Sequence, residues 1–317
     1  VDGCFSTSTP AVTELFQSML SQGVIHPAKR PESCVLPEKM KLEEVQRCPP
    51  KYTKLFQEVL CDMFQCENLS QLHECDHGPI ETMIPALYHA RIQAKLEKGS
   101  RGMGEDRSVG KRIIKSQKAA WRNNAHLQKL VEVYKSFVFE CILPQFADYG
   151  EIIYQAEPII RIVFPGSVAP AKLHADADFW HQSNEINYWV PLVRVQGENS
   201  LWVESTPNQG DFHSLDLDGS VGEYIRFYGN QCRHYTTDNS TDSTRVSFDF
   251  RVIPASLFRN VEGPSAEAAD PEAVNSLEST ENAKVWCGAK PRGAKPLLEG
   301  KYYLRMSPSD EHLVVRD

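Results

Sequence analysis

The chain of 317 residues carries a net charge of −8 at pH 7, with 41% hydrophobic and 24% charged residues. This composition and length are typical of a globular protein with a substantial core, built as one large domain or two smaller ones. The acidic balance disfavours a nucleic-acid partner, and no apolar run approaches the roughly 20 residues that cross a bilayer.

The cysteines bear on the cellular compartment. There are nine of them, an odd number scattered along the chain, which favours reduced thiols in a cytosol-like compartment over a disulfide framework. The N-terminus has no basic or apolar signal segment, but it lacks Met, which leaves a removed transit segment open. We therefore expect a cytoplasmic protein and interpret the N-x-S/T sequences at Asn68 and Asn239 as coincidental.

Residues 1–150 have the periodicity of helices. Thr9-Pro10 supplies an N-cap and a proline at the first helical position, and Gly23 supplies a stop. Helical spacing of apolar residues recurs in 52–66, 79–96 and 109–146. The last of these segments has one apolar face, as expected of a helix packed on a sheet. That face carries Trp121, Leu127, Leu130, Val131, Val133 and Phe137.

This half also contains a dense group of thiols and imidazoles, namely Cys61, Cys66, His73, Cys75 and His77. Zinc is one interpretation, but the spacing lacks the short C-x2-C pairs of zinc ribbons. We favour buried or helix-borne cysteines accompanied by solvent-exposed histidines.

At about residue 151 the period changes from helical to alternating. Strand-like runs occur at 152–154, 158–164, 185–192, 199–204, 223–228 and 244–252. Short strands at this spacing predict a double-sheet jelly roll or barrel, with a helical layer over one sheet. The expected fold class is α+β, with a double-stranded β-helix (jelly roll, cupin-like) core. We expect a helical N-terminal region at 1–150, the core at 151–256 and a C-terminal extension at 257–317, together forming one integrated domain. An edge strand within 302–315 is left open.

The stretch from Leu173 to His181 follows a strand-like run and contains two imidazoles and two carboxylates. In an extended chain residues i and i+2 point to the same side, so His174 and Asp176 can aim a nitrogen and an oxygen at one point. A second histidine would complete a facial triad for a divalent transition metal. His234, which follows a strand and a turn, is the candidate. Asp178 and His181 are weaker ligand candidates because neither has the i+2 spacing from His174.

The run Arg245-Val246-Ser247-Phe248-Asp249-Phe250-Arg251 alternates strictly, so its polar residues share one face. A guanidinium binds a carboxylate bidentately and a neighbouring hydroxyl adds a donor. Arg245 and Ser247 therefore favour a buried anion site. The alternative for Arg245 is a salt bridge with Asp249 or Glu185, and for Arg251 we favour such a structural ion pair.

Together these residues form the pattern H-x-D…H…R-x-S, which is similar to the signature of Fe(II)/2-oxoglutarate-dependent dioxygenases. Within the phytanoyl-CoA hydroxylase superfamily, the runs at 185–189, 199–205 and 245–254 resemble a streptomycin-biosynthesis-protein-like branch. The block His174-x-Asp176-x3-Trp180-His181 resembles ectoine hydroxylases. The resemblance covers about residues 158–254. It implies that His174, Asp176 and His234 hold Fe(II) as catalytic residues, and that Arg245 and Ser247 hold 2-oxoglutarate.

The resemblance further implies an enzyme that uses O2 and 2-oxoglutarate to oxidise an unactivated C–H bond of a small polar metabolite, releasing succinate and CO2. Hydroxylation is the default, with desaturation and oxidative cyclisation as alternatives. Halogenating relatives have a small residue at the position of Asp176, so halogenation is disfavoured. A non-catalytic metal-binding sensor has no need of Arg245 and Ser247, and a protein-modifying oxygenase usually has further recognition modules. We expect specialised metabolite biosynthesis as the setting.

Candidate substrate contacts come from strand parity and from the ectoine-type block. Trp180 is a candidate wall of the pocket, with simple packing as the alternative. Parity alone places four further residues toward the pocket: Arg161, Asn187, Trp189 and Glu204. An inward-pointing Arg161 and Glu204 would favour a zwitterionic or amino-acid-like substrate.

Overall fold

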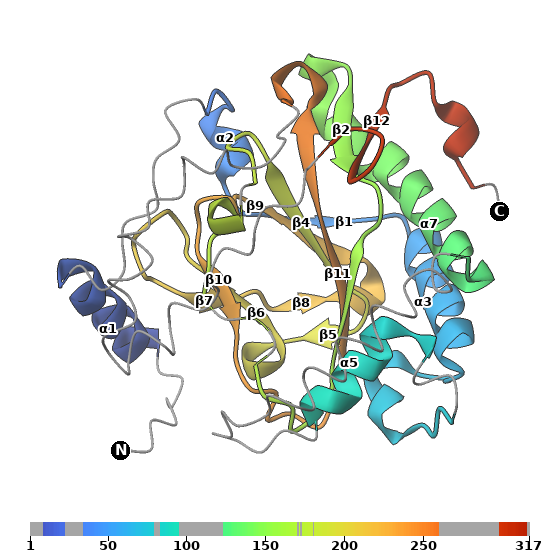
Figure 1. Ribbon diagram of the computed structural model, residues 1–317, viewed down its shortest axis with the longest axis horizontal. Helices are drawn as coiled ribbons and strands as arrows, with labels where there is room; N and C mark the ends of the chain where they lie inside the picture. Colours follow the sequence, from blue (N-terminus) through green and yellow to red (C-terminus); the bar gives the residue numbers. More distant parts are fainter. Residues whose placement is uncertain are drawn as a thin grey trace.

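A computed structural model describes residues 9–22, 34–78, 83–94, 123–169, 171, 173–179, 181–259 and 298–315. Its described part combines helices with antiparallel sheets (Figure 1). The helical elements before residue 150 are α1 (Thr9–Ser21), α2 (Glu38–Lys41), α3 (Pro50–Phe64), η1 (Leu69–Glu74), α5 (Pro85–Ala94), α7 (Ala125–Phe137), η2 (Val138–Ile142) and η3 (Leu143–Tyr149). They confirm the expected helical segments where those segments are described. Trp121 lies outside the described residues.

Strands dominate after residue 150. They are β2 (Ile152–Gln155), β3 (Ile159–Val163), β4 (Ile186–Pro191), β5 (Arg194–Val195), β6 (Leu201–Val203), β7 (His213–Ser214), β8 (Leu217–Asp218), β9 (Glu223–Phe227), β10 (His234–Thr236), β11 (Arg245–Pro254) and β12 (Tyr303–Met306). The six strand-like runs in the sequence correspond to β2, β3, β4, β6, β9 and β11.

The strands form three antiparallel sheets. The largest has the order β1-β9-β4-β11-β2-β12, with β3 also paired to β11, and includes β1 (Glu44–Arg47) from the first half. A second sheet has the order β10-β6-β7, and β5 pairs with β8. A bridge between His174 and His234 ties the chain before η4 (Asp176–Phe179) to the second sheet.

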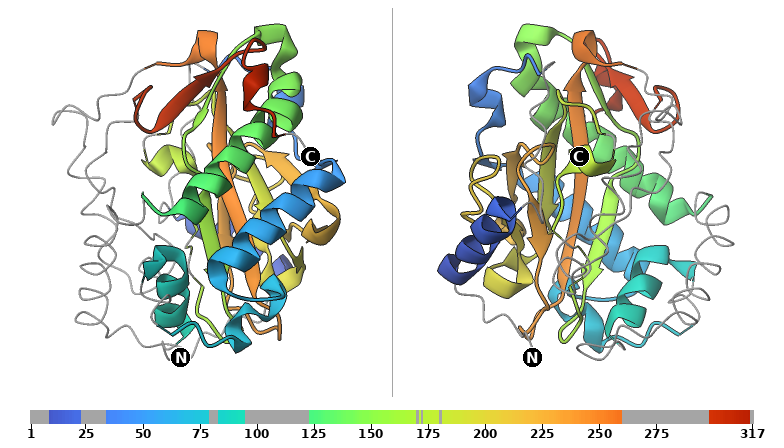
Figure 2. Two further views of the ribbon diagram at one scale, coloured as in Figure 1. Left: turned by 90° about the vertical axis from the view of Figure 1, so that its right-hand side faces the viewer. Right: turned by 60° about the vertical axis from the view of Figure 1, so that its left-hand side comes forward.

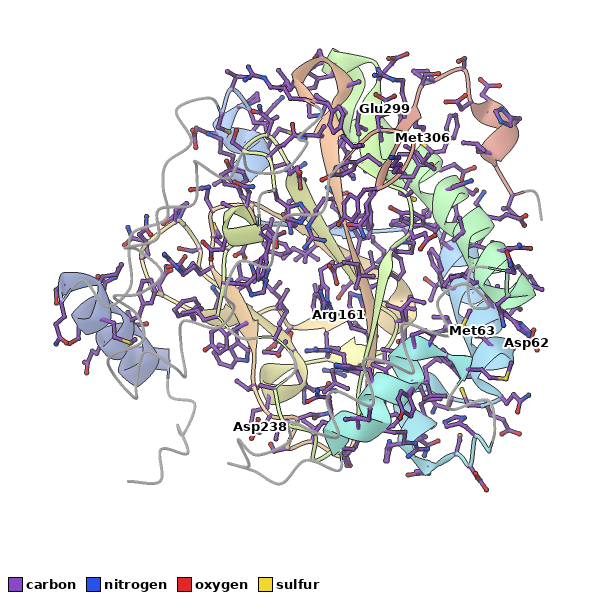
Figure 3. The ribbon with its side chains drawn as sticks, viewed as in Figure 1. Asp62, Met63, Arg161, Asp238, Glu299 and Met306 are labelled. Carbon is purple, nitrogen blue, oxygen red and sulfur yellow. The ribbon has the colours of Figure 1, made fainter. Side chains whose placement is uncertain are left out.

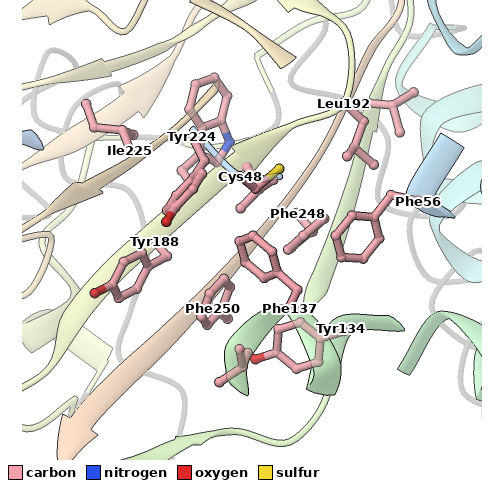
Figure 4. Close-up of a cluster of buried hydrophobic side chains, with 14 of the residues drawn as sticks. Cys48, Phe56, Tyr134, Phe137, Tyr188, Leu192, Tyr224, Ile225, Phe248 and Phe250 are labelled. Carbon is pink, nitrogen blue, oxygen red and sulfur yellow. The ribbon is translucent and has the colours of Figure 1, made fainter. Parts of the chain in front are cut away.

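One face of the large sheet is covered by α3 and α7 (Figure 2). The apolar residues of β11 point to this face, where Phe248 packs 5.0 Å from Phe56 and Phe250 packs 5.1 Å from Tyr134, measured between ring centroids. Figure 4 shows these rings together with Phe137 between the helices and the strand. The strict alternation of β11 therefore leaves its polar face on the opposite side of the sheet.

Removing the Phe248 ring is expected to destabilise the protein strongly, because this side chain is only 2% exposed and its neighbours cannot close the resulting cavity. We expect Phe248→Ala to lower the free energy of unfolding by about 3–5 kcal/mol, measured by urea denaturation. Val45→Ala on β1 is the control, since Val45 is 55% exposed and should change stability by about 0.5 kcal/mol or less. Equal effects of the two substitutions would contradict this account of the core.

Two strands of the large sheet have no clear sequence signal. β1 reads Glu-Val-Gln-Arg and lies largely exposed on the sheet edge beside β9, so it carries no apolar alternation. β12 pairs with β2, which settles the open question of an edge strand in the C-terminal segment. No helix in the described ranges is long and apolar enough to cross a membrane.

Candidate metal centre

Three side chains meet between strands of two sheets, because His234 begins β10 and Asp176 bonds to Arg251 on β11. Ligand atoms of His174, Asp176 and His234 all lie within 4.8 Å of one another, close enough to hold one metal ion. The Nε2 atoms of both histidines are 3.8 Å from Asp176 Oδ1. Asp176 and His234 are buried and His174 is partly exposed, so the cluster is accessible from the His174 side. Two imidazoles and one carboxylate on one face form the donor set of non-haem iron sites with open positions.

The local backbone differs from the extended chain expected for this stretch. His174 forms an isolated bridge with His234, through reciprocal hydrogen bonds of 3.2 and 2.8 Å, but Asp176 begins the 3-10 turn η4. Asp178 stabilises that turn, because its Oδ2 accepts a hydrogen bond from the backbone N–H of Ala175 at 2.9 Å. A bridge followed by a tight turn thus brings the two predicted ligands together.

The surroundings of His234 favour the neutral imidazole. Its Nδ1 lies 3.1 Å from the carbonyl oxygen of Cys232 and donates to it, which leaves the lone pair of Nε2 directed toward the cluster. Burial, reinforced by the neighbouring His174, lowers the pKa of His234 to about 4. A neutral imidazole with a free Nε2 is the form that coordinates a metal.

Asp176 is held by the side chains of Arg251 and Asn187, whose contacts with it were not predicted from the sequence. Its Oδ2 accepts hydrogen bonds from Arg251 Nε at 2.8 Å and from Asn187 Nδ2 at 2.6 Å, and its Oδ1 accepts from Arg251 Nη2 at 3.1 Å. Burial would raise the pKa of Asp176, but Arg251 and the nearby histidines outweigh it and hold that pKa well below its usual value. The carboxylate is therefore ionised, and Oδ1 is the oxygen turned toward both histidines.

Arg251 belongs to a chain of ion pairs along the polar face of β11. Its Nη1 lies 3.3 Å from Asp249 Oδ2, and Asp249 Oδ1 accepts from Arg161 Nε at 2.6 Å. Burial would raise the pKa of Asp249, but the two arginines lower it. The ion pair with Asp249 that was favoured for Arg251 is therefore present. Arg251 also makes a bidentate ion pair with Asp176.

Arg245 and Ser247 have no comparable partners. Arg245 is 2% exposed and donates from Nη1 to the carbonyl oxygen of Ser200, while its Nε and the Ser247 hydroxyl are buried without a hydrogen-bond partner. Burial, together with Arg161, lowers the pKa of Arg245 to about 9, and the opposing effect of Asp249 is too small to offset them. The salt bridge considered for Arg245 is not formed among the described residues, because Asp249 pairs with Arg161 and Arg251, and Glu185 with His181. A ligand carboxylate would complete this site.

The candidate substrate residues occupy different surroundings. Asn187 and Trp189 lie opposite Arg251 and Asp249 in the β4–β11 pairing, so they share the polar face. Arg161 lies opposite Ser247, near the middle of the molecule (Figure 3), with 38% of its side chain exposed. Trp180 lies outside the described residues.

Glu204 is fully buried and occupied within the chain. Its Oε1 accepts from the backbone N–H of Gly210 at 3.0 Å and its Oε2 from that of Arg233 at 2.7 Å. Burial raises the pKa of Glu204 despite these bonds. The carboxylate thus connects the loop between β6 and β7 to the loop between β9 and β10.

Phe179 is an aromatic residue at the site that sequence reasoning missed. Its ring packs edge-on against His174 at 5.2 Å between centroids, and the residue is 37% exposed. It lies on the accessible side of the cluster and directly precedes Trp180, the residue predicted to form a wall of the pocket. The available signal was the position of Phe179 in the sequence, one residue before Trp180.

The thiol–imidazole group does not assemble as one site. Cys61, Cys66 and Cys75 line a pocket of about 430 Å³, but His73 bonds to Thr244 and His77 to the carbonyl of Leu72. Cys61 and Cys66 flank the left-handed cap at the end of α3, where the Cys66 N–H bonds to the Cys61 carbonyl. The expectation of solvent-exposed histidines is wrong for His77, which is 3% exposed. The seven cysteines among the described residues are free thiols.

Comparison with known proteins gives one relative in sequence. The streptomycin biosynthesis protein StrG of Streptomyces griseus is 35% identical over 127 residues, which are 40% of this chain and 57% of StrG. The chain thus matches little more than half the length of this curated relative. No protein-family model matches the chain.

Comparison with solved structures gives matches of low TM-score, among them non-haem α-ketoglutarate-dependent enzymes. The α-ketoglutarate-dependent epimerase SnoN from nogalamycin biosynthesis is 17% identical, with 58% of this chain and 73% of SnoN covered and a TM-score of 0.35. The apoform of EctD from S. alaskensis is 11% identical, with 73% and 84% covered and a TM-score of 0.39. TM-scores below 0.5 do not establish a common fold, so the function proposed below depends on the residues of the site.

Proposed function

We propose that this protein is a non-haem iron oxygenase that uses 2-oxoglutarate and O2 to oxidise a small polar metabolite, on a jelly-roll core. The observation that carries the proposal is the placement of His174, Asp176 and His234 around one point. The strand whose Arg251 binds Asp176, β11, also carries a buried arginine and serine with unpartnered donor atoms. Similarity to StrG supports a setting in specialised metabolite biosynthesis.

The residues fit the metal. His174 Nε2, His234 Nε2 and Asp176 Oδ1 would hold Fe(II) on one face, leaving the opposite face for ligands. When bound with 2-oxoglutarate and O2, Fe(II) supplies the oxidation of an unactivated C–H bond with release of succinate and CO2. The chain holds Asp176 ionised through Arg251, keeps Nε2 of His234 free of its proton, and excludes water around both residues.

The residues also fit the cosubstrate. The Arg245 guanidinium and the Ser247 hydroxyl are buried donors, two residues apart on β11, and face the same side of the sheet. One carboxylate can accept from both and neutralise the buried cation. A metal-dependent hydrolase or a non-catalytic sensor would leave these donors without a ligand.

The proposal is tested by anaerobic titration of the purified protein with Fe(II) and then 2-oxoglutarate. We expect a visible metal-to-ligand charge-transfer band that requires both components. Succinate in place of 2-oxoglutarate is the control, since it lacks the keto group that chelates the metal. A folded, iron-loaded protein that develops no band with 2-oxoglutarate would remove this function.

Arg161 is the residue we propose for recognition of the substrate. Its Nε is fixed by Asp249, and 38% of its side chain is exposed, so the rest of the guanidinium can meet an anionic group of an amino-acid-like substrate. For a substrate found by screening metabolites for succinate release, we expect Arg161→Ala to raise KM at least about tenfold, the effect of losing one hydrogen bond to a charged group. The KM for 2-oxoglutarate should change much less.

Equal effects of Arg161→Ala on the two KM values would contradict this role. Glu204→Ala is the comparison, because its carboxylate bonds to backbone N–H groups of the chain itself. We expect that variant to unfold at lower urea concentration. Hydroxylation remains the default outcome of the reaction, with desaturation and cyclisation as the alternatives that product analysis separates.

A further inference from the structure

Two adjacent tyrosines connect the C-terminal segment to the candidate metal centre. Tyr303 begins β12, which pairs with β2 at the edge of the large sheet, and Tyr302 directly precedes the strand. Tyr303 is buried and Tyr302 is partly buried, and the two rings pack against each other at 4.7 Å between centroids. Their hydroxyl groups donate to two different residues near the metal centre, Gln155 and Glu185.

Tyr302 supports Arg251. Its hydroxyl donates to Gln155 Oε1 at 3.0 Å, and the same oxygen accepts from Arg251 Nη1 at 3.2 Å. Gln155 is itself fixed, since its Nε2 donates to the carbonyl of Glu157 at 2.8 Å. Arg251 then makes the two hydrogen bonds that orient Asp176. A continuous path of hydrogen bonds thus runs from β12 to the carboxylate ligand.

Tyr303 supports the loop that follows the ligand. Its hydroxyl donates to Glu185 Oε1 at 2.6 Å, and Glu185 Oε2 lies 2.7 Å from His181 Nδ1. The backbone N–H of Gln182 also donates to Glu185 Oε1, at 3.0 Å. Glu185 is 1% exposed, so its contacts with this loop are sheltered from water. The segment between η4 and β4 is therefore tied to β12.

We propose that Tyr302 and Tyr303 are positioning residues of the metal centre, so that the C-terminal strand is a working part of the site. Tyr302 acts through Gln155 and Arg251 on the orientation of Asp176, and Tyr303 acts through Glu185 on the loop behind it. This inference rests on the metal centre of the proposed function, and it is independent of the reaction carried out there. Partners of metal ligands commonly change metal affinity about 10–100-fold.

Binding of Co(II) by the purified full-length protein tests the inference without turnover. Affinity is measured by titration, and the d–d absorption reports the coordination of the ion. We expect Tyr302→Phe and Tyr303→Phe each to weaken Co(II) binding about 2–10-fold, the effect of one buried hydrogen bond. Arg251→Met should weaken it about 10–100-fold and change the d–d spectrum.

The chain provides a matched control for the loss of a buried hydroxyl. Tyr188 on β4 is fully buried, and its hydroxyl donates to Gln145 Oε1 at 2.8 Å, as that of Tyr302 does to Gln155. Tyr188 lies on the helix-covered face of the sheet, stacked on Phe250. Tyr188→Phe should therefore lower the urea midpoint as much as Tyr302→Phe while leaving Co(II) affinity unchanged.

A double-mutant cycle tests the path through Arg251. If Tyr302 acts through this arginine, Tyr302→Phe should have no further effect on Co(II) affinity in the Arg251→Met background. Should Arg251→Met fail to fold, Gln155→Leu interrupts the same path and takes its place in the cycle.

The possible failures are distinguishable. A parent protein that binds no Co(II) would remove the proposed metal centre and this inference with it. A parent that binds Co(II) while the Tyr302 and Tyr303 variants behave like Tyr188→Phe would overturn the inference alone. Additive effects of Tyr302→Phe and Arg251→Met would overturn the path through Arg251.

Discussion

Asp176→Ala is expected to abolish Fe(II) binding and succinate formation. The variant loses one of three ligands, so the loss should exceed the about 10–100-fold effect of removing an outer partner of a ligand. It also leaves the buried Arg251 without its bidentate partner, which is expected to cost about 3–5 kcal/mol of stability. Fe(II) titration, an assay of succinate and urea denaturation measure the three effects.

The loss of iron binding and the loss of stability can be separated by a second substitution. Asp176→Ala with Arg251→Met removes both members of the buried ion pair, and such pairs can be replaced by apolar residues at little cost in stability. The double variant should therefore recover much of the lost stability without recovering iron binding. Recovery of iron binding together with stability would show that Asp176 acts only as a structural residue.

Arg245→Met is expected to impair use of 2-oxoglutarate and leave Fe(II) affinity unchanged. Hydrogen bonds to a charged group contribute about 1.5–3 kcal/mol, which corresponds to a rise of roughly 10–200-fold in the KM for 2-oxoglutarate. The stability of the ligand-free variant, in contrast, should not fall. Because Arg245 has no carboxylate partner among the described residues, its removal in the absence of ligand is expected to leave the melting temperature equal or higher.

Thermal melting with and without 2-oxoglutarate checks both parts of this prediction. The parent protein should gain stability on adding the cosubstrate, and the Arg245→Met variant should not. Arg226→Met is the matched control, since Arg226 is also a buried arginine but pairs with Glu44 on the other face of the sheet. A fall in melting temperature of the ligand-free Arg245 variant would indicate a structural cation.

The alternation of polar and apolar residues along β11 made the strand that carries the polar residues of the candidate site predictable. An apolar face with two phenylalanines is typical of a strand packed on a covered core, and two arginines with a serine and an aspartate on the other face favour a polar site there. The structure has that arrangement, with Phe248 and Phe250 under the helices and Arg251 on Asp176. The cluster of His174, Asp176 and His234 was predictable because the chemical types and order of these residues are specific as a set.

The supports of the ligands were not predictable, for a physical reason. Hydrogen bonds between residues far apart in sequence, such as Tyr303 to Glu185 or Arg251 to Gln155, leave no local periodicity. Tyr302 and Tyr303 are ordinary strand residues by composition, and β1 is too polar to be recognised. Parity placed Asn187 and Trp189 on the face of the sheet that carries Arg251 and Asp249, but it could not show that Asn187 binds Asp176 or that the chain itself occupies Glu204.

The bridge between His174 and His234 has a consequence for how a metal would load. Reciprocal backbone hydrogen bonds set the distance between the two imidazole-bearing segments without any ion. Little conformational entropy is then lost when an ion arrives, unlike in small zinc domains, where the metal must order an unfolded chain. Removal of the metal by a chelator should therefore leave a folded protein that can bind metal again. Metal would then add stability only by mass action, about 2.7 kcal/mol at a hundredfold excess over Kd.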